Sequence, residues 1–191
     1  MIEAFFSSTA IVALAEIGDK TQLLAILLAT RLRAPLQIAL GILVATLANH
    51  FLAAWLGAQA GALLDSDGFR YAVAAGFVAM GLWTLIPDKF DENEAPARRG
   101  SAFMTTLVAF FLVEIGDKTQ IATIALGARY GDAVAVTAGT TLGMMLANLP
   151  AIWLGETLVR RIPLTTIRFA AAALLIAMGL LLAAQTAGLF G

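Results

Sequence analysis

The chain has 191 residues, of which 60% are hydrophobic and 13% charged, and its mean hydropathy of +0.88 is far above that of a soluble domain. The formal net charge of −1 gives no indication of a polyanionic partner such as nucleic acid. Because the sequence contains no cysteine, disulfides, thiolate metal sites and cysteine nucleophiles are excluded.

The predicted elements are apolar helices that follow one another along the whole chain. A bilayer core requires about 20 consecutive apolar residues per spanning helix. In chain order, six stretches meet this requirement: 5–30, 36–61, 69–87, 103–128, 132–157 and 165–190. Almost nothing remains for a separate soluble catalytic or nucleic-acid-binding domain. We therefore predict an all-α membrane protein with six transmembrane helices that is not an enzyme.

The charged connections between these helices predict how the chain is oriented in the membrane. Most of the positive charge is in the first, third and fifth connections and at their edges: Arg31, Arg33, Lys89, Arg98, Arg99, Arg160, Arg161 and Arg168. The second and fourth connections carry only Arg70 and Arg129. Because positively charged loops stay in the cytoplasm, we predict that both termini lie outside and that the polar linker 88–101 lies inside.

The two halves of the chain, 1–87 and 102–191, repeat each other at an offset of 98 residues. The segment EIGDKTQ occurs at 16–22 and again at 114–120, and such self-similarity indicates an internal duplication. Each half has three predicted spanning helices, so the second half enters the membrane from the opposite side. The halves are therefore predicted to be inverted repeats, related by a pseudo-two-fold axis in the membrane plane.

The repeated motif places charge where a bilayer tolerates it least. Each copy has a glutamate, an aspartate and a lysine near the middle of its predicted helix: Glu16, Asp19, Lys20, Glu114, Asp117 and Lys118. A charge at the centre of a spanning helix costs roughly 2.5–3.5 kcal/mol, so these side chains are expected to face inward and to be paired, hydrated or neutralised. Inverted repeats bring equivalent positions together, so the two motifs should face one another at mid-membrane.

Four motif carboxylates are predicted to bind a divalent cation: Glu16, Asp19, Glu114 and Asp117. Secondary ligands or tuning groups are expected among the polar side chains nearby: Gln22, Gln120, Lys20, Lys118, Thr21, Thr119, Asn49 and Asn148. Oxygen donors without thiolate favour Ca²⁺, Mn²⁺ and Mg²⁺ over zinc and copper. When the metal leaves, the crowded carboxylates should take up protons, because burial and neighbouring negative charges disfavour their charged form.

The same residues have a structural interpretation. Glu16 with Lys20, and Glu114 with Lys118, have the four-residue spacing of ion pairs that could lock two helices together. Two symmetric copies, each with an additional aspartate, favour a binding site over this alternative. A cation channel that uses the same carboxylates is a further alternative.

The twin E-x-G-D-[KR]-[TS] motif, in two three-helix halves joined by a polar linker, resembles the Gdt-type manganese/calcium transporters of the calcium/cation antiporter superfamily. The resemblance covers essentially the whole chain. It implies a secondary active transporter that exchanges Mn²⁺, or next Ca²⁺, for protons by alternating access, with the four motif acids as metal ligands and no permanently bound cofactor. For a bacterial member it implies export across the cell (inner) membrane. The expected partners are the metal ion, protons and the lipid bilayer, without nucleic acid, and an oligomer is compatible with the sequence.

Overall fold

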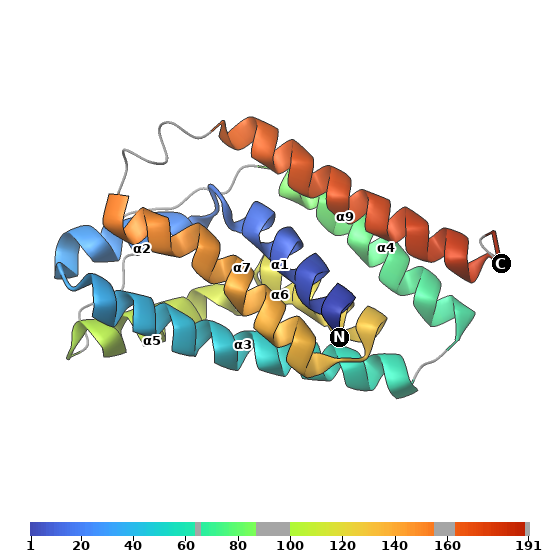
Figure 1. The fold of residues 1–191 in the computed structure, drawn as a ribbon, viewed down its shortest axis with the longest axis horizontal. Helices are drawn as coiled ribbons and strands as arrows, with labels where there is room; N and C mark the ends of the chain where they lie inside the picture. The colour runs from blue at the N-terminus through green and yellow to red at the C-terminus, as the bar shows by residue number, and fades with distance from the viewer. Residues whose placement is uncertain (64–65, 87–99, 155–162, 190–191) are drawn as a thin grey trace.

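The computed structural model describes residues 1–63, 66–86, 100–154 and 163–189, and within these residues it is entirely helical (Figure 1). The helices are α1 (Ile2–Glu16), α2 (Lys20–Leu32), α3 (Pro35–Leu63), α4 (Asp67–Thr84), α5 (Ala102–Glu114), α6 (Lys118–Tyr130), α7 (Ala133–Leu154) and α9 (Leu164–Thr186). The all-α prediction is therefore confirmed. All but the last two residues of the predicted linker 88–101 lie outside the described residues.

Two of the predicted spanning segments, 5–30 and 103–128, are not single continuous helices but are each broken at the repeated motif. The first is divided into α1 and α2, and the second into α5 and α6. At both breaks the backbone turns through a glycine with positive φ, +82° at Gly18 and +77° at Gly116. Such a conformation cannot continue a right-handed helix, and glycine adopts it without a steric penalty. The other four predicted helices correspond to α3, α4, α7 and α9.

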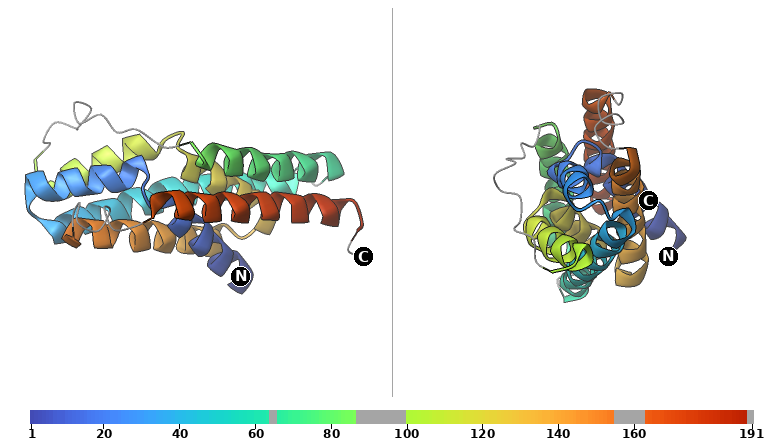
Figure 2. Two further views of the ribbon diagram at one scale, coloured as in Figure 1. Left: turned by 90° about the horizontal axis from the view of Figure 1, so that it is seen from above. Right: turned by 90° about the vertical axis from the view of Figure 1, so that its left-hand side faces the viewer.

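The helices pack as one bundle with a side pair. α3 contacts α5, α6 and α7, while α1 lies along α7. α4 and α9 pack along each other and cover the part of the bundle that is farther from α2 and α5 (Figure 2). In the contact between α4 and α9, Gly81 packs against Ala172 and Gly179 packs against Ala74. The two contacts are equivalent under the sequence repeat, because Gly179 is 98 residues after Gly81 and Ala172 is 98 residues after Ala74.

The same offset appears where the long helices meet the motif helices. Gly41 of α3 packs against Thr106 of α5, and Gly139 of α7 packs against Ser8 of α1. Gly139 is 98 residues after Gly41, and Ser8 is 98 residues before Thr106. Equivalent positions of the two halves thus make equivalent contacts with the opposite half.

The surface and the interior of the bundle have the polarity expected of a protein in lipid. Large apolar side chains such as Leu36, Phe51 and Trp55 are exposed along α3, whereas Thr46 and Asn49 of the same helix are buried. Among the described helices, α3, α7 and α9 are each long and apolar enough to cross a membrane. These features support a protein that crosses the membrane several times.

Candidate metal-binding site

The two helix breaks build the candidate site because each one places acidic residues at a helix terminus. Glu16 and Glu114 are the last residues of α1 and α5, whereas Asp19 and Asp117 are the N-caps of α2 and α6. In each break the aspartate N–H donates to the carbonyl of the preceding glutamate, with N···O distances of 3.1 Å. The partial positive charge of a helix N-terminus favours a carboxylate at the N-cap position.

The motif glutamines stabilise the breaks. The Gly18 N–H donates to Oε1 of Gln22 at 2.9 Å, and the Gly116 N–H donates to Oε1 of Gln120 at 2.8 Å. Gln22 also donates through Nε2 to the carbonyl of Ala147 on α7, at 2.8 Å. The structure therefore places both glutamine oxygens on loop N–H groups, and the role of these residues as secondary ligands or tuning groups stays a prediction.

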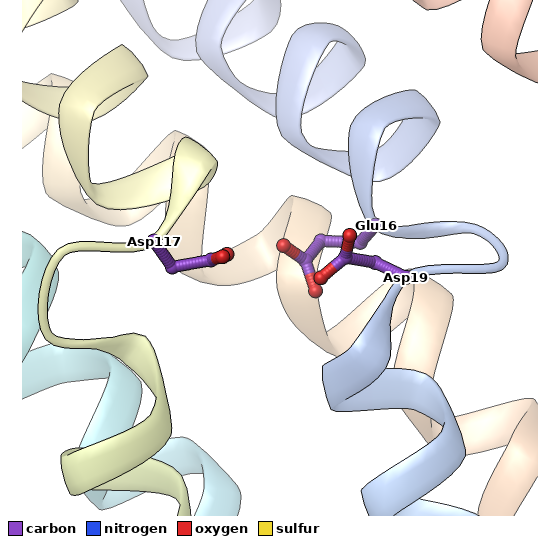
Figure 3. Close-up of side chains that lie close together, drawn as sticks. All are labelled: Glu16, Asp19 and Asp117. Carbon is purple, nitrogen blue, oxygen red and sulfur yellow. The ribbon is translucent and has the colours of Figure 1, made fainter. Parts of the chain in front are cut away.

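Three of the four predicted carboxylates come together in the interior (Figure 3). One carboxylate oxygen each from Glu16, Asp19 and Asp117 lies within 4.8 Å of the other two. All three residues are buried, with exposed fractions of 0%, 5% and 3%. Oε1 of Glu16 is buried and has no hydrogen-bond partner among the described residues. Since a buried carboxylate oxygen normally has a partner, this atom is available for a cation or a proton.

The fourth predicted ligand, Glu114, is buried beside α3 and lies outside this three-carboxylate cluster. Thr46 donates to its Oε1 at 2.9 Å, and Asn49 donates to its Oε2 at 3.2 Å. Thr46 was not singled out from the sequence, although it lies three residues before Asn49 and therefore on the same helix face. Asn148, the repeat counterpart of Asn49, instead donates to the carbonyl of Met144 at 3.0 Å.

The motif lysines and threonines surround the cluster. Nζ of Lys20 lies 2.8 Å from Oδ1 of Asp117, so this ion pair joins the two halves of the chain and not two residues of one motif. Lys118 donates to the carbonyl of Ile86 at 3.3 Å. The Thr21 hydroxyl donates to Glu16, and the Thr119 hydroxyl donates to Oδ2 of Asp117 at 3.2 Å.

Replacing either break glycine by alanine is expected to destabilise the protein, because a side chain in the left-handed region costs about 1–2 kcal/mol. Gly116→Ala should show this backbone cost alone, since a Cβ there would have no atom within 4 Å. Gly18→Ala should cost somewhat more, because its Cβ would lie 2.8 Å from Cδ2 of Leu164. The measurement is thermal unfolding of the purified protein in detergent.

Gly76→Ala is the matched control, because Gly76 lies within α4 and a Cβ there would also have open space around it. Alanine is the better helix former, so this variant should be as stable as the parent or more stable. Equal stability of all three variants would contradict the assignment of the breaks to the two motif glycines.

Comparisons with known proteins show which family the chain resembles. The family model for the divalent cation/proton antiporter GDT1 matches residues 4–92 and 102–188. A Vibrio cholerae protein named "Putative manganese exporter" is 51% identical over 170 residues, covering 88% of this chain and 84% of its own. A Synechocystis protein, GDT1-like protein sll0615, is 30% identical and covers 87% and 90%, and GDT1-like protein 4 of Oryza sativa subsp. indica is 29% identical and covers 87% and 68%.

No solved structure matches the chain at a comparable level of significance. The family match spans both halves and includes both copies of the motif, and it confirms the resemblance stated above. It also confirms the prediction that the protein is not an enzyme. The chain therefore belongs to the GDT1 family of divalent cation/proton antiporters and is a multi-pass membrane protein that transports divalent cations.

Proposed function

We propose that this protein exports Mn²⁺ from the cytoplasm across the cell membrane in exchange for protons. The observation that carries the proposal is the buried convergence of Glu16, Asp19 and Asp117, drawn from both copies of the motif, within 4.8 Å. A site made of carboxylate and hydroxyl oxygens suits Mn²⁺ and Ca²⁺ alike. The name of the Vibrio cholerae relative favours Mn²⁺, so Ca²⁺ is the second candidate.

Exchange for protons follows from the charge of the cluster. Carboxylates that share a buried site repel one another, so they require either a bound cation or added protons. Glu16 is the candidate proton carrier, because its Oε1 has no other hydrogen-bond partner among the described residues. Metal and protons would then compete for the same oxygens, and each would leave when the other binds. Glu114 would complete the ligand set or hold a second proton when Thr46 and Asn49 release it.

Alternating access would use the two halves of the chain as inverted repeats, 1–87 and 102–191, joined by the cytoplasmic linker 88–101. The glycine contacts repeated at the 98-residue offset support this proposal, because they join each half to the other in the same way. The distribution of arginine and lysine supports an orientation with both termini outside.

Proteoliposomes that contain the purified protein and an internal pH-sensitive dye test the proposal. A Mn²⁺ gradient should drive proton movement, and a Ca²⁺ gradient should drive it less. Added Mg²⁺ or Zn²⁺ should compete only weakly with Mn²⁺. Metal flux with a conductance but no coupled proton movement would instead indicate a channel. If no metal moves at all, the buried charges are structural and the proposal is wrong.

A further inference from the structure

The structure contains a cavity of about 630 Å³ that shares no lining residue with the carboxylate cluster. The cavity lies where α3, α6 and α9 end and where α1 and α4 begin. Its polar lining includes Glu3, Arg70, Arg129, Tyr130 and Gln185. A volume of this size is typical of sites that hold a small molecule or part of one.

The guanidinium group of Arg129 is the unusual feature of this cavity. Its Nε and Nη1 atoms are buried and have no hydrogen-bond partner among the described residues. Arginine stays protonated in proteins, so these nitrogens are donors on a permanent positive charge. A buried charged donor without an acceptor is costly, so an acceptor from outside the described chain is expected here.

Several interactions stabilise the position of the Arg129 guanidinium without accepting a hydrogen bond from Nε or Nη1. Its guanidinium carbon lies 5.3 Å from the centroid of the Tyr130 ring, a distance at which a cation and an aromatic face attract each other. Oη of Tyr130 lies 3.5 Å from Oε1 of Glu3. Arg129 is also in the last turn of α6, where the helix dipole favours a cation. None of these interactions supplies an acceptor for Nε or Nη1.

The charges around the cavity favour an anion. Arg70 and Arg129 provide two positive charges to the cavity lining, and Glu3 provides one negative charge. Guanidinium groups bind phosphate oxygens strongly because the hydrogen bonds are assisted by charge. The cavity lies at the ends of helices that include the spanning candidates α3 and α9, which is the depth of lipid headgroups.

We propose that this cavity binds a phosphate group through Arg129 and Arg70, supplied either by the headgroup of an anionic phospholipid or by free phosphate. The site is separate from the carboxylate cluster, so the proposal does not depend on the transported metal. A lipid headgroup bound here would join the α4–α9 pair to α3 and α6, because residues of all four helices line the cavity.

Native mass spectrometry of the full chain in detergent micelles tests the proposal by titration with phosphatidylglycerol in one arm and inorganic phosphate in the other. Arg129→Gln is expected to weaken binding of one of these probes at least tenfold. The matched control is Arg168→Gln, because Arg168 is the repeat counterpart of Arg70 but lies near the start of α9, away from the cavity. It should bind as the parent does.

The two arms distinguish the sources of the phosphate. Binding of phosphatidylglycerol that depends on Arg129 assigns the site to a lipid, whereas binding of inorganic phosphate alone that depends on Arg129 assigns it to a free anion. If Arg129→Gln does not fold, Arg70→Gln provides the test, with an expected loss of at least threefold. Binding that is equal in the parent, both cavity variants and the control would overturn the proposal.

Discussion

Asp117→Asn is expected to abolish metal-driven proton movement in proteoliposomes, and Asp19→Asn is expected to do the same. Each substitution preserves the shape of the side chain but removes one charged oxygen from a cluster whose members lie within 4.8 Å of one another. Removing a residue that only hydrogen-bonds to a metal ligand typically costs about 10–100-fold in affinity or activity. Because Asp19 and Asp117 are proposed to be direct ligands, their loss should cost about 100-fold or more.

Both substitutions should weaken Mn²⁺ binding and should also reduce the coupling of metal movement to proton movement. Asparagine cannot carry the proton that a carboxylate would exchange for the metal. Asp117→Asn also removes the ion pair between Asp117 and Lys20, whose Nζ lies 2.8 Å from Oδ1 of Asp117. The initial rate of dye quenching after a Mn²⁺ step gives the transport activity, and isothermal titration of the detergent-solubilised variant gives the affinity. Both should fall for the two aspartate variants.

Asp132→Asn is the matched control for these variants. Asp132 is an acid at the start of α7, where its Oδ1 accepts from the N–H of Ala135 at 3.0 Å, and asparagine can accept the same hydrogen bond. It lies outside the carboxylate cluster, so its exchange rate should equal that of the parent. Parental exchange rates in Asp19→Asn and Asp117→Asn would show that the transport site lies elsewhere.

The sequence was sufficient to predict the helical class and the meeting of the two motifs. Charged side chains within an apolar spanning segment must face the protein interior and find partners there. A duplication with an odd number of spans brings equivalent positions of the two halves together. The convergence of Glu16 and Asp19 with Asp117 agrees with this reasoning. The helix breaks could not be predicted, because Gly18 and Gly116 are compatible with either a helical glycine or a turn, and the sequence alone does not determine φ at a glycine.

The difference between the two glutamates could not be predicted from identical motifs, because it arises from the helices that pack against them. Glu114 accepts hydrogen bonds from Thr46 and Asn49 of α3. At the corresponding place α7 has Met144 and Met145 in place of the threonine, and its Asn148 donates to the carbonyl of Met144. Repeat symmetry predicts where the motifs lie, and local packing decides which oxygens remain open.

Lys20→Met is expected to tighten Mn²⁺ binding about tenfold, equivalent to ~1.4 kcal/mol, and to slow turnover. In the structure the Lys20 ammonium forms an ion pair with Oδ1 of Asp117. It therefore competes with the metal for this oxygen. Without this tethered cation the carboxylates repel one another more strongly, so both Mn²⁺ and protons should bind more tightly. Turnover should fall because the metal leaves more slowly when no ammonium replaces it.

Titration calorimetry with Mn²⁺ measures the first effect, and the rate of metal-driven dye quenching measures the second. Lys20→Arg is the matched control, because it keeps a positive charge beside Asp117 and should stay closer to the parent in affinity. Combining Lys20→Met with Asp117→Asn should remove the gain in affinity, since the two side chains act through one contact. Weaker Mn²⁺ binding in Lys20→Met alone would instead show that the lysine supports the occupied site, and that it does not compete with the metal for Asp117.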